Sequence, residues 1–227
     1  MNKKFYPLLI AVLMLTALAV YTGVRTARAQ STFSFAEEKK IYLTFDDGPS
    51  TVVTGRILDT LREENVRATF FIVSDRVRGR EEVLRRIVRE GHTVGVHSAT
   101  HCYSEIYSSD EALLADVDAC AAVIRRVTGT TPCVYRFPGG GSRDLQRQTE
   151  LLTSRGYRVV RWNAVCGDEE LIGASAARLV EETLRTSGQK SNVVLLLHDS
   201  APHKATAEAL PEIIRSFRER GYTFCAY

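Results

Sequence analysis

The sequence predicts one α/β domain built on a parallel sheet or barrel of about seven strands. Short β-rich runs alternate with amphipathic stretches over residues 40–227, which is the pattern of a parallel α/β fold with right-handed crossovers. The run Asn192–His198 (NVVLLLH) is almost wholly apolar, as expected for a strand that is covered on both faces. Residues with chemically capable side chains follow several of these runs, where the active site of such a fold lies.

The predicted strands are rich in β-branched and aromatic residues. The run Lys40–Phe45 (KIYLTF) alternates along the chain, and Arg67–Val73 (RATFFIV) is dense in strand-forming residues. The seven predicted strands, in chain order, are Lys40–Phe45, Arg67–Val73, Thr93–Val96, Cys133–Phe137, Tyr157–Asn163, Asn192–His198 and Tyr222–Cys225.

The stretches between these strands have apolar residues at helical spacing. In the second of them Leu84, Ile87 and Val88 share one face, and Gly91 follows as a stop signal. Glycines also end three later helices, at Gly129, Gly156 and Gly188. The six predicted helices are Val53–Glu64, Arg80–Glu90, Asp110–Thr128, Asp144–Ser154, Ala174–Ser187 and Lys204–Glu219.

The composition is that of an ordinary globular protein. Hydrophobic residues make up 44% and charged residues 25% of the 227 residues, which excludes a disordered or collagen-like chain. Residues 1–29 carry four basic and no acidic side chains, so the rest of the chain has a net charge of −1. A domain this close to neutrality gives no electrostatic reason to expect a nucleic-acid partner.

Residues 1–29 have the pattern of an export segment. Lys3 and Lys4 precede the apolar run Leu8–Tyr21, and small residues, Ala27 and Ala29, end the segment at the spacing of a cleavage site. The run is short for a membrane span of about 20 residues, which favours a cleaved signal peptide over an uncleaved N-terminal membrane anchor. Both interpretations place the rest of the chain outside the cytoplasmic membrane, after a connector over residues 30–39.

Five cysteines occur in the exported part, and their pairing is open. No two of them form a C-x-x-C pair, which argues against a zinc ribbon or a thioredoxin-type site. Export permits disulfides, so one or two bridges and a set of buried free thiols are both compatible with the sequence. The cysteines are Cys102, Cys120, Cys133, Cys166 and Cys225.

Two histidines four residues apart, His97 and His101, suggest a metal site. A tight turn or a helix would bring both to one face, and a carboxylate from the pair Asp46 and Asp47 could complete the ligand set. Three protein ligands with open positions are typical of catalytic zinc, although other divalent metals, including non-haem iron, also suit this set. Side chains of neighbouring residues in an extended chain point opposite ways, so one aspartate could bind the metal and the other could act as general base.

Five motifs occur in the order found in one known family. They are T-F-D-D-G-P at Thr44–Pro49, H-S-x-x-H at His97–His101, R-x-P-G at Arg136–Gly139, Trp162 followed six residues later by Asp168, and L-x-L-H-D at Leu195–Asp199. The chain from about Lys40 to Tyr227 therefore resembles the polysaccharide deacetylase family, which is the NodB-homology group or carbohydrate esterase family 4.

The resemblance implies a distorted (β/α) barrel, a bound Zn²⁺ (or Co²⁺ or another divalent ion), and N-acetylated or O-acetylated polysaccharides as substrates. Hydrolysis of an acetamide requires an activated water, a cation near the developing oxyanion and an acid for the amine leaving group, and the motifs supply a candidate for each. By this resemblance Asp47, His97 and His101 are metal ligands, Asp46 is the general base oriented by Arg136, His198 is the general acid held by Asp168, and the backbone near Pro138 and Gly139 contacts the oxyanion.

The chain departs from many relatives at the acetyl pocket. Many of them have a tryptophan after the aspartate that corresponds to Asp168, whereas this chain has Glu169. A glycine run, Gly139–Gly141, stands where many relatives have a tyrosine. We therefore expect a pocket built differently, from Trp162, Leu195 and Leu197.

These features predict a metal-dependent N-deacetylase, secreted or anchored outside the cytoplasmic membrane and acting as a monomer. Peptidoglycan is the expected substrate, and chitooligosaccharides are the next. An O-acetyl esterase of the xylan type is the first alternative. A catalytically silent polysaccharide-binding module is the second, although the base, ligand and acid positions are all occupied by suitable residues.

Overall fold

The structure is a computed structural model that describes residues 13, 14, 16, 38–140 and 145–227. The rest of the predicted export segment, most of the connector, Gly141 and Asp144 lie outside the described residues. One compact unit spans Glu38–Tyr227. Among the residues that the structure describes, no helix is both long enough and apolar enough to cross a membrane.

Strands and helices alternate along the compact unit, as predicted. The strands are β1 (Lys40–Gly48), β2 (Thr69–Val73), β3 (Thr93–Ser98), β4 (Val134–Tyr135), β5 (Arg158–Val159), β6 (Ala164–Val165), β7 (Asn192–His198) and β8 (Thr223–Cys225). The helices are α2 (Val53–Glu63), η1 (Ser74–Arg76), α3 (Glu81–Arg89), α4 (Tyr103–Ile106), α5 (Asp110–Thr128), α6 (Gln146–Ser154), α7 (Ala176–Ser187) and α8 (Lys204–Glu219).

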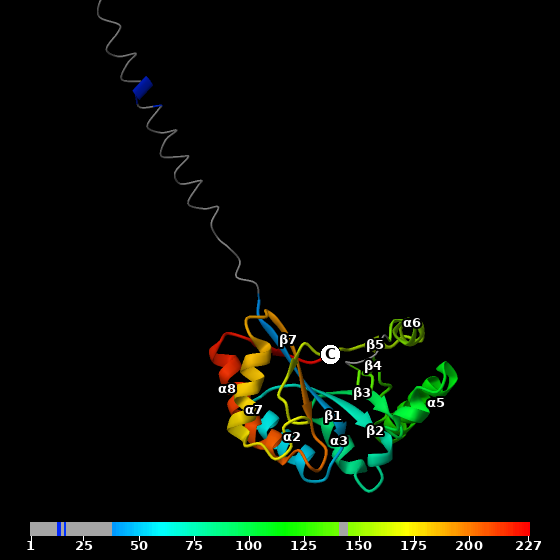
Figure 1. The fold of residues 1–227 in the computed structure, drawn as a ribbon. Helices are drawn as coiled ribbons and strands as arrows, with labels where there is room; N and C mark the ends of the chain where they lie inside the picture. Colours follow the sequence, from blue (N-terminus) through cyan, green and yellow to red (C-terminus); the bar gives the residue numbers. More distant parts are fainter. Residues whose placement is uncertain (1–12, 15, 17–37, 141–144) are drawn as a thin grey trace, which may run out of the picture. The chain divides into compact units, whose positions relative to one another are not determined.

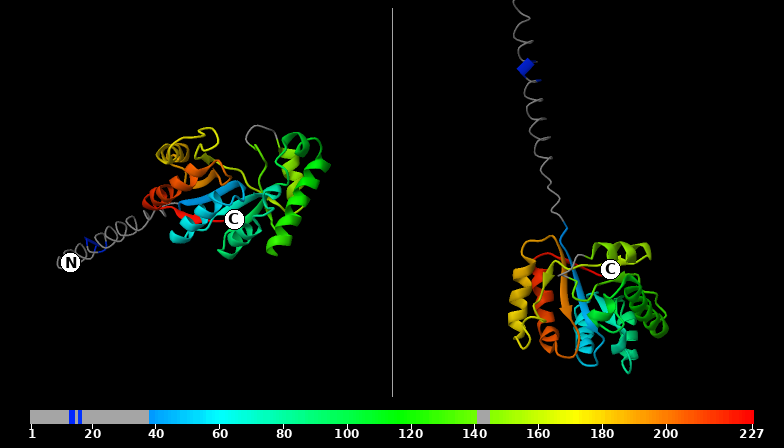
Figure 2. Two further views of the ribbon diagram at one scale, coloured as in Figure 1. Left: turned by 90° about the horizontal axis from the view of Figure 1, so that it is seen from below. Right: turned by 45° about the vertical axis from the view of Figure 1, so that its right-hand side comes forward.

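All eight strands belong to one parallel sheet with β1 at its centre. The strand order is β5-β4-β3-β2-β1-β7-β6, and β8 pairs with the first residues of β1. Figures 1 and 2 show the helices packed around this curled sheet, with α7 and α8 on one side and α5 on the other. The predicted fold class, a distorted (β/α) barrel, is confirmed.

The predicted fifth strand is wrong in its extent. Tyr157–Asn163 is not one strand, because β5 pairs with β4 at one edge of the sheet while β6 pairs with β7 at the other edge. Residues 160–163 connect the two edges, and Asn163 pairs with β7 through its side chain, which accepts from the Val194 N–H at 2.9 Å. The sequence pattern shows strand-forming residues, but it does not show that the chain changes edges within them.

This connection defines the curl of the sheet. A chain advances at most about 3.6 Å per residue, so the five steps from Val159 to Ala164 span no more than about 18 Å. The edge strands β5 and β6 therefore lie close to each other although five other strands lie between them along the sheet. The sheet is consequently bent into an incomplete barrel.

Local signals set the helix ends, and the predicted glycine stop after α5 is confirmed, whereas the serine caps were not predicted. The Ser109 side chain accepts a hydrogen bond from the Ala112 N–H at the start of α5, and Gly129 ends this helix with φ 74°. Ser175 caps α7 in the same way. Two short elements, η1 and α4, carry no apolar periodicity and were not predicted.

The interior is closely packed against both faces of the central strands. The rings of Phe45 and Phe70 stack with centroids 5.0 Å apart, and Leu195 of β7 is fully buried.

All five cysteines are free thiols, and no disulfide forms within the described domain. Of the two alternatives that the sequence left open, free thiols are the one observed. Burial raises the pKa of the Cys120 thiol to about 12, so this group packs as an apolar residue.

We expect Leu195→Ala to lower the free energy of unfolding by about 2–5 kcal/mol, because it leaves a cavity beside a buried central strand. Ile172 is 73% exposed, and Ile172→Ala is the matched control, expected to change stability by less than about 0.5 kcal/mol. Urea unfolding measures both variants. Equal stability losses would contradict the assigned burial.

Candidate active site

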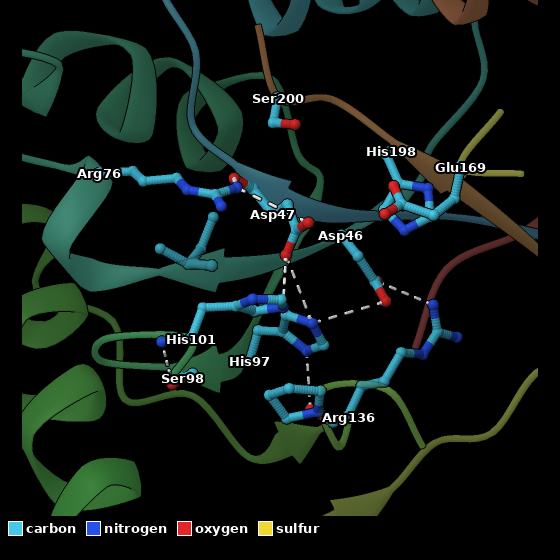
Figure 3. Close-up of polar contacts among 12 residues, drawn as sticks. Asp46, Asp47, Arg76, His97, Ser98, His101, Arg136, Glu169, His198 and Ser200 are labelled. Atoms are coloured by element: carbon cyan, nitrogen blue, oxygen red, sulfur yellow. Dashed lines mark hydrogen bonds and ion pairs between the residues drawn. The ribbon is translucent and has the colours of Figure 1, made fainter. Parts of the chain in front are cut away.

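The predicted catalytic side chains meet at the carboxyl ends of the parallel strands. Asp46 and Asp47 lie near the end of β1, His97 near the end of β3, and His198 at the end of β7. His101 follows β3 in a turn, and Arg136 directly follows β4. Figure 3 shows these side chains pointing toward one another.

Three of them form a candidate metal centre. The Asp47 Oδ1 atom lies 3.1 Å from His101 Nε2 and 3.5 Å from His97 Nε2. One ligand atom from each residue lies within 4.8 Å of the others. The same Oδ1 atom is buried and makes no hydrogen bond of normal geometry, so its position fits a carboxylate that ligates a cation.

The expected arrangement of the two aspartates needs correction. Their side chains do not point opposite ways, since the Asp46 Oδ2 atom lies 3.9 Å from His97 Nε2 and Asp47 Oδ1 also approaches that nitrogen. Asp47 has φ 76°, a left-handed conformation that breaks the alternation of the strand. This backbone turn brings both carboxylates to one side.

The segment after His97 is a tight turn and not a helix. His101 has φ 63°, and its backbone N–H donates to Ser98 Oγ at 2.8 Å. Asp116 of α5 fixes the turn, because its Oδ1 atom accepts from Ser98 Oγ and from the Ala99 N–H, each at 3.0 Å. The H-x-x-x-H spacing therefore brings its imidazoles together through turn geometry.

The electrostatics suit ligation. Burial lowers the pKa of His97, which keeps its imidazole neutral. Its Nδ1–H donates to the Arg136 carbonyl at 2.8 Å, which leaves Nε2 directed at Asp47. Burial opposes ionisation of Asp47, but the close contacts with the His101 and His97 imidazoles and the charge of Arg76 outweigh it and lower the pKa of this carboxyl.

Arg136 is a buried cation, 1% exposed, that holds Asp46 in place. Its Nη1 atom donates to Asp46 Oδ1 at 2.9 Å and to Thr44 Oγ1 at 2.7 Å. The guanidinium carbon lies 4.4 Å from the centroid of the Phe71 ring and 5.6 Å from that of Trp162. These contacts fix the direction of the Asp46 carboxylate.

His198 and Asp168 form a second buried pair across the site. His198 Nδ1 donates to Asp168 Oδ1 at 2.8 Å, while the other carboxylate oxygen accepts from the His198 backbone N–H at 2.8 Å and from Thr206 Oγ1 at 2.7 Å. Burial alone would lower the pKa of His198, but the hydrogen bond and charge of Asp168, together with the charges of Asp46 and Asp47, raise it to about 9.

A cavity of about 280 Å³ opens beside these groups, and two predicted lining residues do not belong to it. Gly139 and Trp162 line it as predicted, whereas Leu195 and Leu197 are fully buried in the core on the other face of β7. Leu196 lines the cavity instead, because successive strand residues face opposite sides. Pro138 is buried behind the lining, where its carbonyl accepts from the Tyr107 hydroxyl at 2.7 Å.

Sequence reasoning missed several residues of the site. Arg76, from η1, donates to the Asp47 carbonyl. Tyr103, two residues after His101, lines the cavity, and a Cβ at Gly139 would lie 3.0 Å from its hydroxyl. This close approach and the positive φ of Gly139, 62°, both favour glycine at this position. The remaining unpredicted lining residues are Phe137, Val165, Gly167, Glu170 and Leu196.

The fold and the site together define a barrel hydrolase with a candidate Asp/His/His metal centre. Residues 35–160 match the family model described as polysaccharide deacetylase, and the chain belongs to that family. The predicted family and the expected hydrolase of the polysaccharide N-deacetylase type are confirmed by this match and by the relatives below.

Similar proteins act on bacterial cell walls according to their names. The chain is 32% identical over 204 residues to a peptidoglycan-N-acetylglucosamine deacetylase of Bacillus cereus, over 88% of this chain and 73% of that protein. It is 32% identical over 185 residues to the peptidoglycan-N-acetylmuramic acid deacetylase PdaC of Bacillus subtilis, over 82% of this chain and 37% of that protein.

Solved structures agree in fold. The catalytic domain of peptidoglycan N-acetylglucosamine deacetylase from Eubacterium rectale has a TM-score of 0.78 and 31% identity, covering 85% of this chain and 90% of that one. A CE4 esterase of Streptococcus mutans has a TM-score of 0.78 and 30% identity, covering 83% and 86%.

We expect Asp168→Asn to lower the pKa of His198 from about 9 toward or below its ordinary 6.5, because burial then acts without the opposing carboxylate. The folded-state value lies above the ordinary one, so the pair stabilises the protein fully below pH 6.5 and loses this contribution as the pH rises through about 9. NMR titration of the imidazole in metal-free protein measures the change.

Glu170→Gln is the matched control, since it removes a carboxylate from the same cavity and leaves the Asp168–His198 hydrogen bond in place. The assigned pairing is wrong if both variants titrate like the wild type.

Proposed function

We propose that the chain is a zinc-dependent deacetylase that removes N-acetyl groups from N-acetylglucosamine residues of peptidoglycan outside the cytoplasmic membrane. The observation that carries the proposal is the grouping of three features at the carboxyl-end rim of the strands: a candidate metal centre, a carboxylate held by a cation, and an imidazole held by a carboxylate. Amide hydrolysis requires these three kinds of group in one place.

The metal ligands in this proposal are Asp47, His97 and His101. Two imidazoles and a carboxylate match the ligand type of catalytic zinc, and Co²⁺ or another divalent ion suits the same set. A bound divalent cation would polarise the acetyl carbonyl and make a coordinated water more acidic.

Asp46 takes the proton from the attacking water as general base. Its Oδ2 atom faces the metal centre, at 3.9 Å from His97 Nε2, while Oδ1 is occupied by Arg136. One carboxylate oxygen is thus anchored and the other is left to accept a proton. Arg136 is a positioning residue, because its guanidinium contacts Asp46 and not the cavity.

His198 gives a proton to the departing amine as general acid. Asp168 binds its Nδ1–H, which directs Nε2 away from that bond, and His198 lines the cavity. The pKa near 9 keeps the imidazole protonated at neutral pH, as an acid catalyst requires. The amine is a poor leaving group until it is protonated, so this transfer is needed for turnover.

The cavity would hold a single acetamido group or sugar ring. Its volume of about 280 Å³ is at the lower end of ligand sites, which run from about 300 to 1,000 Å³. Trp162, Leu196 and Val165 supply apolar wall, and Gly139 leaves backbone exposed to the ligand. The rest of the polymer would lie across the rim outside the cavity.

Substrate and location follow from the relatives and from the N-terminus. Relatives are named for peptidoglycan N-acetylglucosamine and N-acetylmuramic acid deacetylation, and N-acetylglucosamine is the commoner of these names. The lysine-flanked apolar segment of residues 1–29 supports export, by a signal peptide or an anchor. We propose a monomer, with the membrane reached only through this segment and no nucleic-acid partner.

With one equivalent of Zn²⁺ or Co²⁺, the full chain is expected to release acetate from peptidoglycan and from N-acetylglucosamine oligomers. A chelator should abolish release, and one equivalent of metal should restore it. An enzymatic acetate assay on N-acetylated and O-acetylated polymers also separates the deacetylase from an O-acetyl esterase. Metal-loaded, folded protein that binds the oligomers without releasing acetate would overturn the proposal.

Asp47→Asn is the matching variant for this assay, and it is expected to abolish acetate release by removing a charged ligand. Its control is Asp75→Asn, which changes an exposed aspartate at the carboxyl end of β2. The control should retain wild-type turnover. Loss of activity in both variants would argue against a specific role for Asp47.

His198→Asn is expected to reduce kcat by about 10²–10⁴-fold, the usual contribution of a positioned acid. Zinc added at one equivalent should remain bound after gel filtration, because Asp47, His97 and His101 are unchanged. Acetate release and metal content measure the two effects separately. An unchanged kcat would exclude His198 as the proton donor.

A further inference from the structure

A second group of ligand-type side chains lies at the cavity, where Glu169 and His198 are lining residues. One carboxylate oxygen of Glu169 and one ring nitrogen each of His198 and His203 lie within 4.8 Å of one another. We propose that Glu169, His198 and His203 form a second divalent-cation site, and that a cation bound there inhibits the enzyme by occupying the nitrogen of its proton donor. The inhibitory part of this proposal rests on the proposed role of His198.

The hydrogen bonds leave Nε2 of both imidazoles as the nitrogen that a cation would take. His198 uses Nδ1 for Asp168 at 2.8 Å, and His203 uses Nδ1 for Ser200 Oγ at 2.9 Å. Binding would displace the proton that His198 carries at neutral pH and the contact of His203 Nε2 with Glu169 Oε2 at 3.2 Å. Anchoring of the second nitrogen by a carboxylate or hydroxyl is the usual support of a metal-binding histidine.

The two rings are already arranged as a pair. Their centroids are 5.0 Å apart and their planes are inclined by 26°, so the rings stack, and one nitrogen of each lies within 4.8 Å of the other. The side chains of His198 and His203 are only 11% and 6% exposed, which fixes their rotamers. Little conformational entropy would be lost when both nitrogens bind one ion.

Glu169 is the anionic ligand of the proposed cation site, and it approaches the two imidazoles from the solvent side. Its Oε2 atom lies 3.2 Å from His203 Nε2, while its side chain is 59% exposed and lines the cavity. The carboxylate can move by a rotamer change, whereas the imidazoles are fixed. A cation can thus enter from the cavity and complete the set with water. Figure 3 shows Glu169 beside His198.

The ligand chemistry favours zinc and similar ions over calcium or magnesium. Two imidazoles and one carboxylate are a set that zinc commonly takes in proteins, whereas calcium and magnesium prefer oxygen ligands. This set differs from the Asp47 centre in sharing no residue with it. A chain with both sites therefore binds two zinc ions, and the ion at the second site consumes the Nε2 lone pair of His198.

The test is a zinc titration of the metal-free full chain by calorimetry, with metal content measured after gel filtration. The wild type should bind two equivalents. His203→Asn keeps a side-chain group for Ser200 but removes Nε2, and should bind one equivalent, with the second at least about tenfold weaker, since even loss of a supporting contact costs that much. Glu169→Gln, at an exposed position, should weaken the same event without a folding risk.

His92→Asn is the matched control. His92 is another buried histidine, remote from the cavity, whose Nδ1 accepts from the Ala68 N–H at 3.2 Å, a bond that asparagine can replace. This variant should bind two equivalents. The site does not exist if the wild type binds only one equivalent, or if His203→Asn and Glu169→Gln both still bind two with wild-type affinity.

Acetate release measured at increasing zinc concentration tests whether the second zinc ion inhibits the enzyme. In the wild type, activity should rise with the first zinc equivalent and fall with the second, and in His203→Asn the fall should need at least about tenfold more zinc. An identical fall in both proteins would overturn the inhibitory role. If no acetate is released at any zinc level, the proposed function fails, whereas two equivalents in the wild type and one in His203→Asn still establish the site.

Discussion

The buried guanidinium of Arg136 is the contact on which the geometry of the rim depends. Its side chain holds Asp46 and Thr44 of β1, and its backbone carbonyl accepts from the Nδ1–H of His97 on β3. One residue thus aligns both a carboxylate and an imidazole of the metal centre. A charge this deeply buried is stable only with its partner in place, and removal of one member of such a pair generally costs about 3–5 kcal/mol.

The rim contains two ion pairs of opposite polarity. On one side an anion, Asp46, is held by a cation; on the other side an imidazole, His198, is held by an anion, Asp168. Environments that favour opposite protonation states are what distinguish a base from an acid when both stand in one site. The carboxylate lies on β1 and the imidazole at the end of β7, so the two groups reach the cavity from neighbouring strands.

Much of the fold could be predicted from local patterns, and much of the site from its motifs. The apolar run of β7 and the glycines after the helices are local signals, and they were sufficient for the α/β class. The assignment of Asp46, Asp47, His97, His101 and His198 to one rim needed only the rule that parallel strands end together, with the family resemblance to give each a role. Two failures have different causes. The left-handed backbone of Asp47, which no spacing encodes, reversed its expected side. Leu196, in contrast, stands two residues before His198 on the same face of β7, so strand alternation could have predicted it in place of Leu195 and Leu197. Arg76 and Tyr103 reach the site only through tertiary contacts.

The short connection over residues 160–163 has two structural roles. It ties the edge strands β5 and β6 across the open side of the sheet, and it carries Trp162, whose ring forms a wall of the cavity and stacks on Arg136. The Trp162 ring therefore cannot shift independently of the connection between β5 and β6. Any increase in the distance between β5 and β6 moves Trp162 as well. The width of the cavity therefore depends on the curvature of the sheet.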